Sequence, residues 1–152
     1  MPRLQYVSES SESEELLESL CQPVREWFKD RFLDFTEPQK MAIPQIMGGH
    51  HLLLCSPTGS GKTLTAFLTI IDDLVRRSMN GTLEDGVSCV YISPIKALAN
   101  DIQKNLIGPL NEIRESYLPK RAKEIRVGLR TGDTSQKERD KILRSPPHIL
   151  IT

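Results

Sequence analysis

The sequence predicts an α/β fold in which a parallel sheet carries helices on both faces. Two observations predict it. Four short apolar segments have the length and composition of buried strands, and amphipathic segments with helical spacing separate them. Strand and helix therefore alternate along the chain, and parallel strands joined by right-handed crossovers are the usual outcome of such an order. The predicted strands cover residues 51–56, 87–93, 125–132 and 148–152.

Two helices are predicted before the first strand. Residues 24–33 place their apolar side chains at helical spacing, which predicts a short amphipathic helix. Residues 36–49 begin with Thr36 as an N-cap candidate and end with two glycines, and both features are typical of helix ends. Pro44 lies inside this second helix, and we expect it to kink the helix or to restart a turn.

Three more helices are predicted between the strands. Apolar residues recur at helical spacing over residues 64–75 and again over residues 95–113. Residues 135–143 are mostly charged, but Ser135 and Glu138 form a capping-box signature at their start. Each of these helices connects two successive strands, as a parallel sheet requires.

Composition limits the class of protein. The chain has 152 residues, 20 Lys plus Arg and 20 Asp plus Glu, so it has no formal net charge and enough length for one domain with its own core. It has no apolar run long enough to span a membrane. Three cysteines without a C-x-x-C pair fit a reducing compartment, so we expect a cytoplasmic protein. We expect residues 1–20, rich in Ser and Glu, to form a solvated acidic leader that runs into a helix, and residues 21–152 to form the domain.

The segment after the first predicted strand has the pattern of a phosphate-binding loop. It comprises Ser56, Pro57, Thr58, Gly59, Ser60, Gly61, Lys62 and Thr63. Gly59 and Gly61 let the backbone curl so that successive N–H groups point inward, and the following helix adds the positive end of its dipole. Lys62 would reach the β- and γ-phosphates, and the Thr63 hydroxyl would hold Mg²⁺. The strict pattern has Gly at position 56, where this chain has Ser.

This loop resembles motif I of superfamily 2 helicases and translocases, and a second segment resembles the helicase Q motif. Residues 35–39 read Phe-Thr-Glu-Pro-Gln, and Gln39 precedes Lys62 by 23 residues, as in that superfamily. A carboxamide can donate to and accept from the adenine edge, which would select ATP. Gln39 can also serve as the capping-box partner of Thr36, and one side chain can fill both roles at different times.

Two later segments resemble motifs Ia and Ib of the same superfamily, which contact the nucleic-acid backbone. The first follows the second predicted strand and the other follows the third, and both would present helix or turn N–H groups to phosphates. The residues we expect at the nucleic acid are Pro94, Ile95, Lys96, Thr131, Gly132, Asp133 and Thr134. Without the phosphate loop, the first segment would be a capped helix with a solvated lysine and the second a simple turn.

The motif Ia segment, Ser-Pro-Ile-Lys-Ala-Leu-Ala-Asn-Asp over residues 93–101, is similar to that of large-helicase-related (Lhr) proteins. That family also carries Arg-Glu-Trp-Phe before the Q motif, here residues 25–28. The resemblance implies the amino-terminal part of a first RecA-like domain, which binds ATP and Mg²⁺. It further implies a complete protein that hydrolyses ATP, moves 3′ to 5′ on single-stranded DNA and unwinds DNA or DNA:RNA duplexes. The partners would be single-stranded or partly duplex nucleic acid, with DNA favoured over RNA, and the remainder of the helicase core.

The resemblance ends before the family's motif II, whose Asp-Glu pair supplies the hydrolytic carboxylates. Asp72 and Asp73 form an acidic pair, but they lie within a predicted helix and are expected on its solvated face. We therefore expect this piece of the RecA-like sheet to be incomplete and unable to turn over ATP by itself. Two other interpretations remain open: a nucleotide- or nucleic-acid-binding module without catalysis, and another P-loop motor such as a restriction-type translocase.

Overall fold

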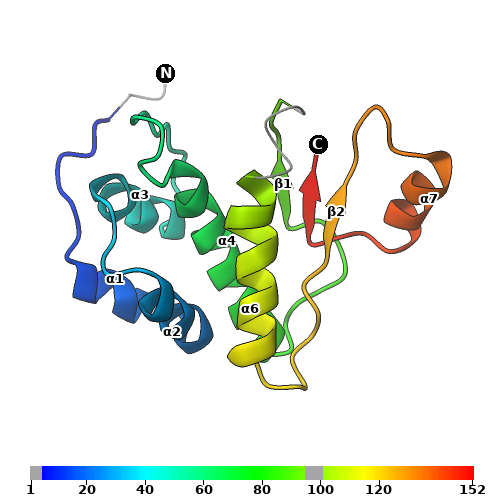
Figure 1. The fold of residues 1–152 in the computed structure, drawn as a ribbon, viewed down its shortest axis with the longest axis horizontal. Helices are drawn as coiled ribbons and strands as arrows, with labels where there is room; N and C mark the ends of the chain where they lie inside the picture. Colours follow the sequence, from blue (N-terminus) through cyan, green and yellow to red (C-terminus); the bar gives the residue numbers. More distant parts are fainter. Residues whose placement is uncertain (1–4, 95–100) are drawn as a thin grey trace.

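The computed structural model describes residues 5–94 and 101–152, and its centre is a sheet of three parallel strands (Figure 1). Across the sheet these are β1 (Cys89–Tyr91), β3 (Ile149–Ile151) and β2 (Val127–Leu129). The central strand β3 pairs Ile149 with Cys89 on one side and with Val127 on the other. Each strand lies within a predicted apolar segment, so the predicted parallel α/β fold is confirmed for these three strands.

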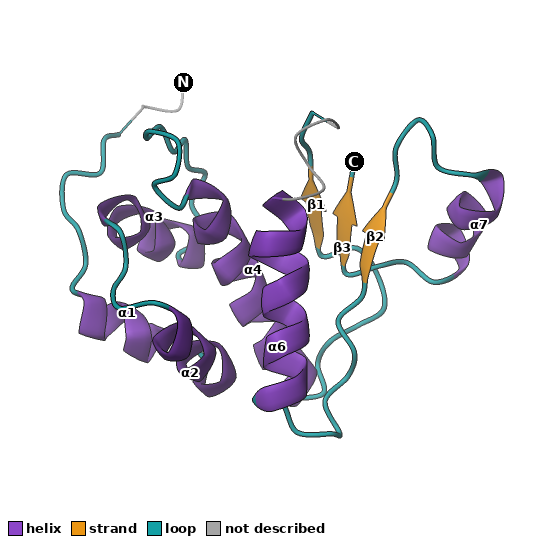
Figure 2. Cartoon of the chain, viewed as in Figure 1, coloured by secondary structure: helices purple, strands orange, loops and turns teal. Residues whose placement is uncertain are grey.

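Six α-helices and one π-helical turn account for the rest of the regular structure among the described residues. They are α1 (Ser13–Ser19), α2 (Gln22–Arg31), α3 (Glu37–Met47), α4 (Lys62–Met79), η2 (Gln103–Ile107), α6 (Gly108–Ser116) and α7 (Gln136–Arg144). Helices α1 to α4 and α6 lie on one side of the strands, and α7 lies beyond β2 (Figure 2). None of the helices in this described part is long and apolar enough to cross a lipid bilayer.

Helix α4 forms the centre of the core. Its side chains Phe67, Leu68 and Ile71 have no exposed surface, and they lie at the helical spacing seen in the sequence. The helix packs against α2, α3 and η2. The phosphate loop is thereby attached to a helix packed in the core, because α4 begins at Lys62.

The end of the acidic leader is part of this core. Helix α1 follows the Ser- and Glu-rich residues, as expected of a segment that runs into a helix. Its Leu16 is buried and so is Leu20, the residue that ends it, and both belong to the main hydrophobic cluster. The leader is therefore not solvated over its whole length. The domain boundary at residue 20 stays a prediction.

The prediction of a solvated face for Asp72 was wrong. Its side chain is 2% exposed, and its two carboxylate oxygens accept the backbone N–H of Cys21 at 2.6 Å and the Nε–H of Arg76 at 2.7 Å. A buried carboxylate is tolerated when its oxygens are satisfied in this way. It joins the start of α2 to α4, while the neighbouring Asp73 is exposed as expected.

The predicted strand over residues 51–56 was also wrong. These residues form no strand and share no backbone hydrogen bond with another described segment. Two of their three leucines are exposed, Leu53 at 80%. An apolar segment becomes a strand only when a neighbouring strand accepts and donates its backbone hydrogen bonds. Residues 51–56 have no such neighbour within the described ranges.

The predicted helix over residues 95–113 is continuous only in part. Residues 95–100 lie outside the described ranges, and beyond them the chain passes through η2 into α6. Pro109 explains the wider turn, because proline has no N–H to donate to the carbonyl of Asn105 and its ring would collide with that carbonyl in an α-helix. Of the other helices, α2, α3, α4 and α7 overlap their predicted ranges. Pro44 lies inside α3, which continues to Met47.

Candidate nucleotide and nucleic-acid site

The phosphate loop joins residues 51–56 to helix α4. Gly59 has φ +82° and Gly61 has φ +86°, which is left-handed backbone that residues with a Cβ rarely adopt. Gly61 is the N-cap of α4, and no described side chain caps this helix end or places an acidic group in its first turn. The first N–H groups of α4 are therefore free of side-chain partners, and the electrostatics of the helix end favour an anion.

Lys62 lies in the first turn of α4 and folds back over the loop. Its ammonium group donates hydrogen bonds to the carbonyl oxygens of Ser56 at 2.5 Å and Pro57 at 2.6 Å. The hydroxyls of Ser56 and Ser60 lie 2.6 Å apart and share a further hydrogen bond across the same loop. Thr58 and Gly59 at the tip are exposed. The lysine charge is thus held inside the loop by main-chain oxygens.

Helix α3 is fastened to this loop through its N-terminus. The Thr36 hydroxyl donates to the carbonyl of Ser60 at 2.9 Å, and the Thr36 backbone N–H donates to Oε1 of Gln39 at 2.9 Å. The Gln39 side chain is buried at 3% exposure, and its Nε2 lies so close to Gly61 that a Cβ there would be 2.8 Å away. The capping role foreseen for Gln39 is therefore present, and its role at adenine stays a prediction.

The Thr63 hydroxyl has a partner that the sequence alone did not indicate. It donates to Oδ2 of Asp101 at 3.0 Å, and Asn105 donates from Nδ2 to Oδ1 of the same carboxylate at 3.1 Å. Among the described residues, no group of three or more His, Cys, Asp or Glu side chains could hold a metal ion. A threonine hydroxyl beside a carboxylate fits Mg²⁺, which keeps several waters and takes its other ligands from substrate phosphates.

The two expected nucleic-acid segments both follow the carboxyl ends of strands. Pro94 is exposed three residues after β1, while Ile95 and Lys96 lie outside the described residues. After β2, residues 131–134 form a turn in which the Thr131 backbone N–H donates to the Thr134 hydroxyl at 2.7 Å. Since the strands are parallel, Pro94 and the Thr131–Thr134 turn follow strand ends on the same edge of the sheet.

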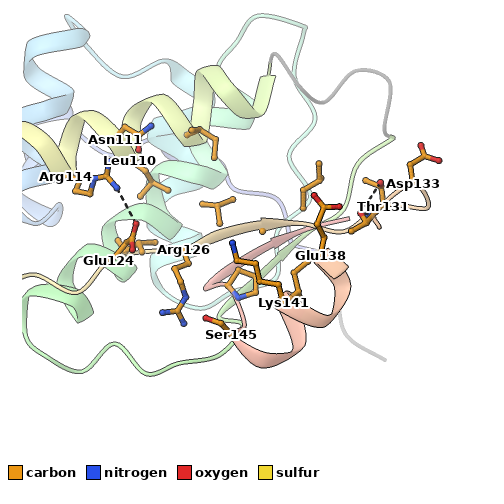
Figure 3. Close-up of a pocket in the computed structure, with 18 residues that line it drawn as sticks. Leu110, Asn111, Arg114, Glu124, Arg126, Thr131, Asp133, Glu138, Lys141 and Ser145 are labelled. Atoms are coloured by element: carbon orange, nitrogen blue, oxygen red, sulfur yellow. Dashed lines mark hydrogen bonds and ion pairs between the residues drawn. The ribbon is translucent and has the colours of Figure 1, made fainter. Parts of the chain in front are cut away.

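Arg139 on α7 fixes the Thr131–Thr134 turn. Its guanidinium donates to the carbonyls of Thr134 at 2.9 Å and Gly132 at 3.0 Å. The turn lies at one end of a groove of about 760 Å³ between α6, β2 and α7 (Figure 3). Asp133 is exposed there. No residue of the phosphate loop lines this groove, so it is a separate feature from the candidate nucleotide site.

A charged cluster lies at the opposite, amino-terminal ends of the strands. Asp85 accepts hydrogen bonds from Arg126 at 2.8 Å and forms an ion pair with Lys123 at 3.0 Å, and these two cations lower the pKa of Asp85 to about 2. His148 is fully buried, and its Nδ1 accepts the backbone N–H of Arg126 at 2.9 Å. Burial, together with the charges of Arg126 and Lys123, holds the pKa of His148 below its ordinary value.

Comparison with known proteins gives consistent results. Residues 36–152 match the family model described as DEAD/DEAH box helicase. The chain is 47% identical over its whole length to the ATP-dependent helicase Lhr-Core of Methanocaldococcus jannaschii and covers 18% of that protein. Over 90% of the chain, it is 54% identical to the Lhr-Core helicase of Methanothermobacter thermautotrophicus and covers 16% of that protein.

A solved structure agrees with these sequence matches. The structure of the Mycobacterium smegmatis helicase Lhr, bound to single-stranded DNA and AMP-PNP, superposes with a TM-score of 0.76 at 40% identity, covering 90% of this chain and 17% of that one. The chain thus spans less than a fifth of the length of these relatives. Because the family match covers more than half of the chain and includes Gln39 and the phosphate loop, the chain belongs to the DEAD/DEAH box helicase family.

Proposed function

We propose that this chain is the ATP-binding portion of a helicase or translocase that couples ATP hydrolysis to 3′-to-5′ movement on single-stranded DNA. The complete motor would unwind DNA or DNA:RNA duplexes. The observation that carries the proposal is the phosphate loop with an uncapped helix end, held against Gln39 and belonging to a helicase family. The Lhr relative bound to single-stranded DNA and AMP-PNP supports both ligands, and DNA over RNA.

Each residue of the nucleotide site has a distinct role in this proposal. The backbone N–H groups of residues 56–61 and the N-terminus of α4 bind the phosphates, and Lys62 exchanges its two carbonyl acceptors for phosphate oxygens. Thr63 offers its hydroxyl oxygen to Mg²⁺, whose charge offsets that of the phosphates. Gln39 lies against Gly61, and it would read the adenine edge at times when its carboxamide is released from the Thr36 N–H.

Movement on nucleic acid requires a second contact surface. We assign it to Pro94, Ile95, Lys96 and the Thr131–Thr134 turn, which would bind backbone phosphates and so carry no sequence preference. Hydrolysis further requires a carboxylate that orients water and an arginine finger, and we assign neither to these 152 residues. We therefore propose that the chain by itself binds ATP without turning it over.

The proposal is tested by the affinity of a fluorescent, non-hydrolysable ATP analogue in the presence of Mg²⁺. Lys62→Ala should weaken binding about 10- to 100-fold, because hydrogen bonds to charged groups contribute roughly 1.5–3 kcal/mol. The matched control is Lys137→Ala on α7, an exposed lysine remote from the loop, which should leave the affinity unchanged. An unmodified protein that does not bind the analogue would refute the ATP-binding role.

Polarity and substrate are tested on the full natural polypeptide. A duplex with a 3′ single-stranded overhang should be unwound with ATP, and the same duplex with a 5′ overhang should not. Replacing the overhang with RNA of the same sequence separates DNA from RNA translocation. Unwinding from the 5′ overhang alone would show that the proposed direction is wrong.

A further inference from the structure

The carboxylate of Asp101 accepts a hydrogen bond on each of its oxygens beside the phosphate loop. One oxygen accepts the Thr63 hydroxyl at 3.0 Å and the other accepts Nδ2 of Asn105 at 3.1 Å. The same Nδ2 also donates to the backbone carbonyl of Asp101 at 3.0 Å. The two hydrogen bonds together fix the orientation of this exposed carboxylate relative to the Thr63 hydroxyl.

The segment that carries Asp101 is fixed against α4. Ile102 and Leu106 are buried in the main hydrophobic cluster, at 8% and 0% exposure. After Ile102 the chain takes the π-helical turn η2, and Gly108 fits closely at its end, since a Cβ there would lie 3.1 Å from the carbonyl of Gln103. Asp101 and Asn105 are therefore presented to α4 by a packed element rather than by a loop.

The direction of the hydrogen bond between Thr63 and Asp101 decides what it can do. A hydroxyl has one hydrogen to donate and two lone pairs to offer. When the hydrogen is directed to Asp101, the lone pairs are free for a cation, and the nearby negative charge makes the oxygen a better ligand. Partners of this kind, which hold a metal ligand in position, change metal affinity about 10- to 100-fold when they are removed.

We propose that Asp101, held by Asn105, is a positioning residue that orients the Thr63 hydroxyl as the protein's ligand to the nucleotide-bound Mg²⁺. This inference rests on the proposed ATP-binding function. It predicts that Asp101 contributes to the extra affinity that Mg²⁺ gives the nucleotide and not to the affinity of the nucleotide alone. Asp101 does not need to touch either the nucleotide or the metal.

The experiment measures the dissociation constant of a fluorescent, non-hydrolysable ATP analogue on the full natural polypeptide, once with saturating Mg²⁺ and once with EDTA. The ratio of the two constants is the Mg²⁺-dependent tightening. Asp101→Ala should lower this ratio about tenfold or more while leaving the constant in EDTA unchanged. Asp101→Asn retains size and one acceptor but loses the charge, so it should lie between Asp101→Ala and the unmodified protein.

Two further variants make the result specific. In a Thr63→Ala background, Asp101→Ala should have no additional effect on the ratio, because the hydroxyl it orients is gone. Asp73→Asn removes another exposed carboxylate of similar type from α4, and it should leave both constants unchanged. If Asp101→Ala does not fold, Asn105→Ala takes its place and should give a smaller loss that is again confined to the Mg²⁺ condition.

The outcomes are distinguishable. Equal weakening with Mg²⁺ and with EDTA would overturn the inference, because it would show that Asp101 only supports the structure of the site. No weakening of binding in Asp101→Ala under either condition would overturn it as well, and the ATP-binding proposal would stand. If the unmodified protein bound the analogue under neither condition, the proposed function itself would fail.

Discussion

A methyl group added at Gly61 tests how the phosphate loop is held. The change Gly61→Ala places a Cβ on backbone with φ +86° and brings it to 2.8 Å from Nε2 of Gln39. Gln39 is 3% exposed and its Oε1 holds the Thr36 N–H at 2.9 Å, so it cannot turn away without losing that hydrogen bond. Gly59→Ala is the matched control, because Gly59 has φ +82° and nothing lies within 4 Å of its added Cβ.

The magnitudes follow from these two differences. Both alanines should cost about 1–2 kcal/mol for the left-handed backbone. Gly61→Ala should cost a further ~1–3 kcal/mol, because a buried donor or acceptor is left without its partner. The excess of Gly61→Ala over Gly59→Ala should disappear in a Gln39→Ala background, where the collision is absent and the cycle isolates the pair.

The assay is equilibrium urea denaturation of the chain, followed by the fluorescence of its single tryptophan, Trp27, which is buried at 3% exposure. The free energy of unfolding is compared among the unmodified chain, both alanine variants and the double variants. If Gly59→Ala cost as much stability as Gly61→Ala, or if the excess cost persisted without Gln39, the close contact between Gln39 and Gly61 would not determine the stability of the loop.

Two further predictions concern the buried polar groups. Burial lowers the pKa of His148 below its ordinary value of 6.5, so as the pH falls the imidazole is protonated in the unfolded chain before it is protonated in the folded chain. The free energy of unfolding should therefore decrease as the pH drops below 6.5. His148→Asn, which keeps an acceptor for the Arg126 N–H, should flatten the dependence of the urea midpoint on pH in this range, whereas an unaltered dependence would assign it to another group. The contribution of Asp85, whose pKa is about 2, should be lost separately and only as the pH falls below 3.8. Asp72→Ala should lower the free energy of unfolding by about 2–3 kcal/mol, because it removes a charged acceptor from the buried Cys21 N–H; a loss no larger than that of the exposed Asp73→Ala would contradict the tie between α2 and α4.

The sequence predicted the elements whose partners lie within the chain. The apolar spacing of α4, the capping box before α7 and the three paired strands all depend on local pattern or on neighbours that the chain supplies. Residues 51–56 have an equally strong strand pattern, but pairing is a property of two segments, and no described segment forms backbone hydrogen bonds with them. Pattern alone could not reveal that difference.

For the candidate nucleotide site, too, the sequence predicted the local features and not the contacts between separate elements. The sequence predicted the order and spacing of the phosphate loop and Gln39. It also predicted that Gly59 and Gly61 adopt backbone conformations suited to glycine, and both have positive φ. Two hydrogen bonds were not predictable, the one from Thr63 to Asp101 and the one from the Cys21 N–H to the buried Asp72. Each of them joins residues from separate elements. Asp101 was visible as the last residue of the motif Ia segment, but nothing in the sequence indicated that it faces Thr63.

The inward-folded Lys62 has a consequence for how quickly and tightly a phosphate chain can be captured. Ordering a free lysine side chain costs up to about 2 kcal/mol of rotamer entropy, and here that cost is already met by two carbonyl oxygens. If the loop binds phosphates as proposed, Lys62 would exchange these neutral acceptors for charged ones without first having to be ordered. A longer, planar guanidinium would not fit between the same two carbonyl oxygens. Lys62→Arg should therefore keep the positive charge and still weaken the binding of the ATP analogue.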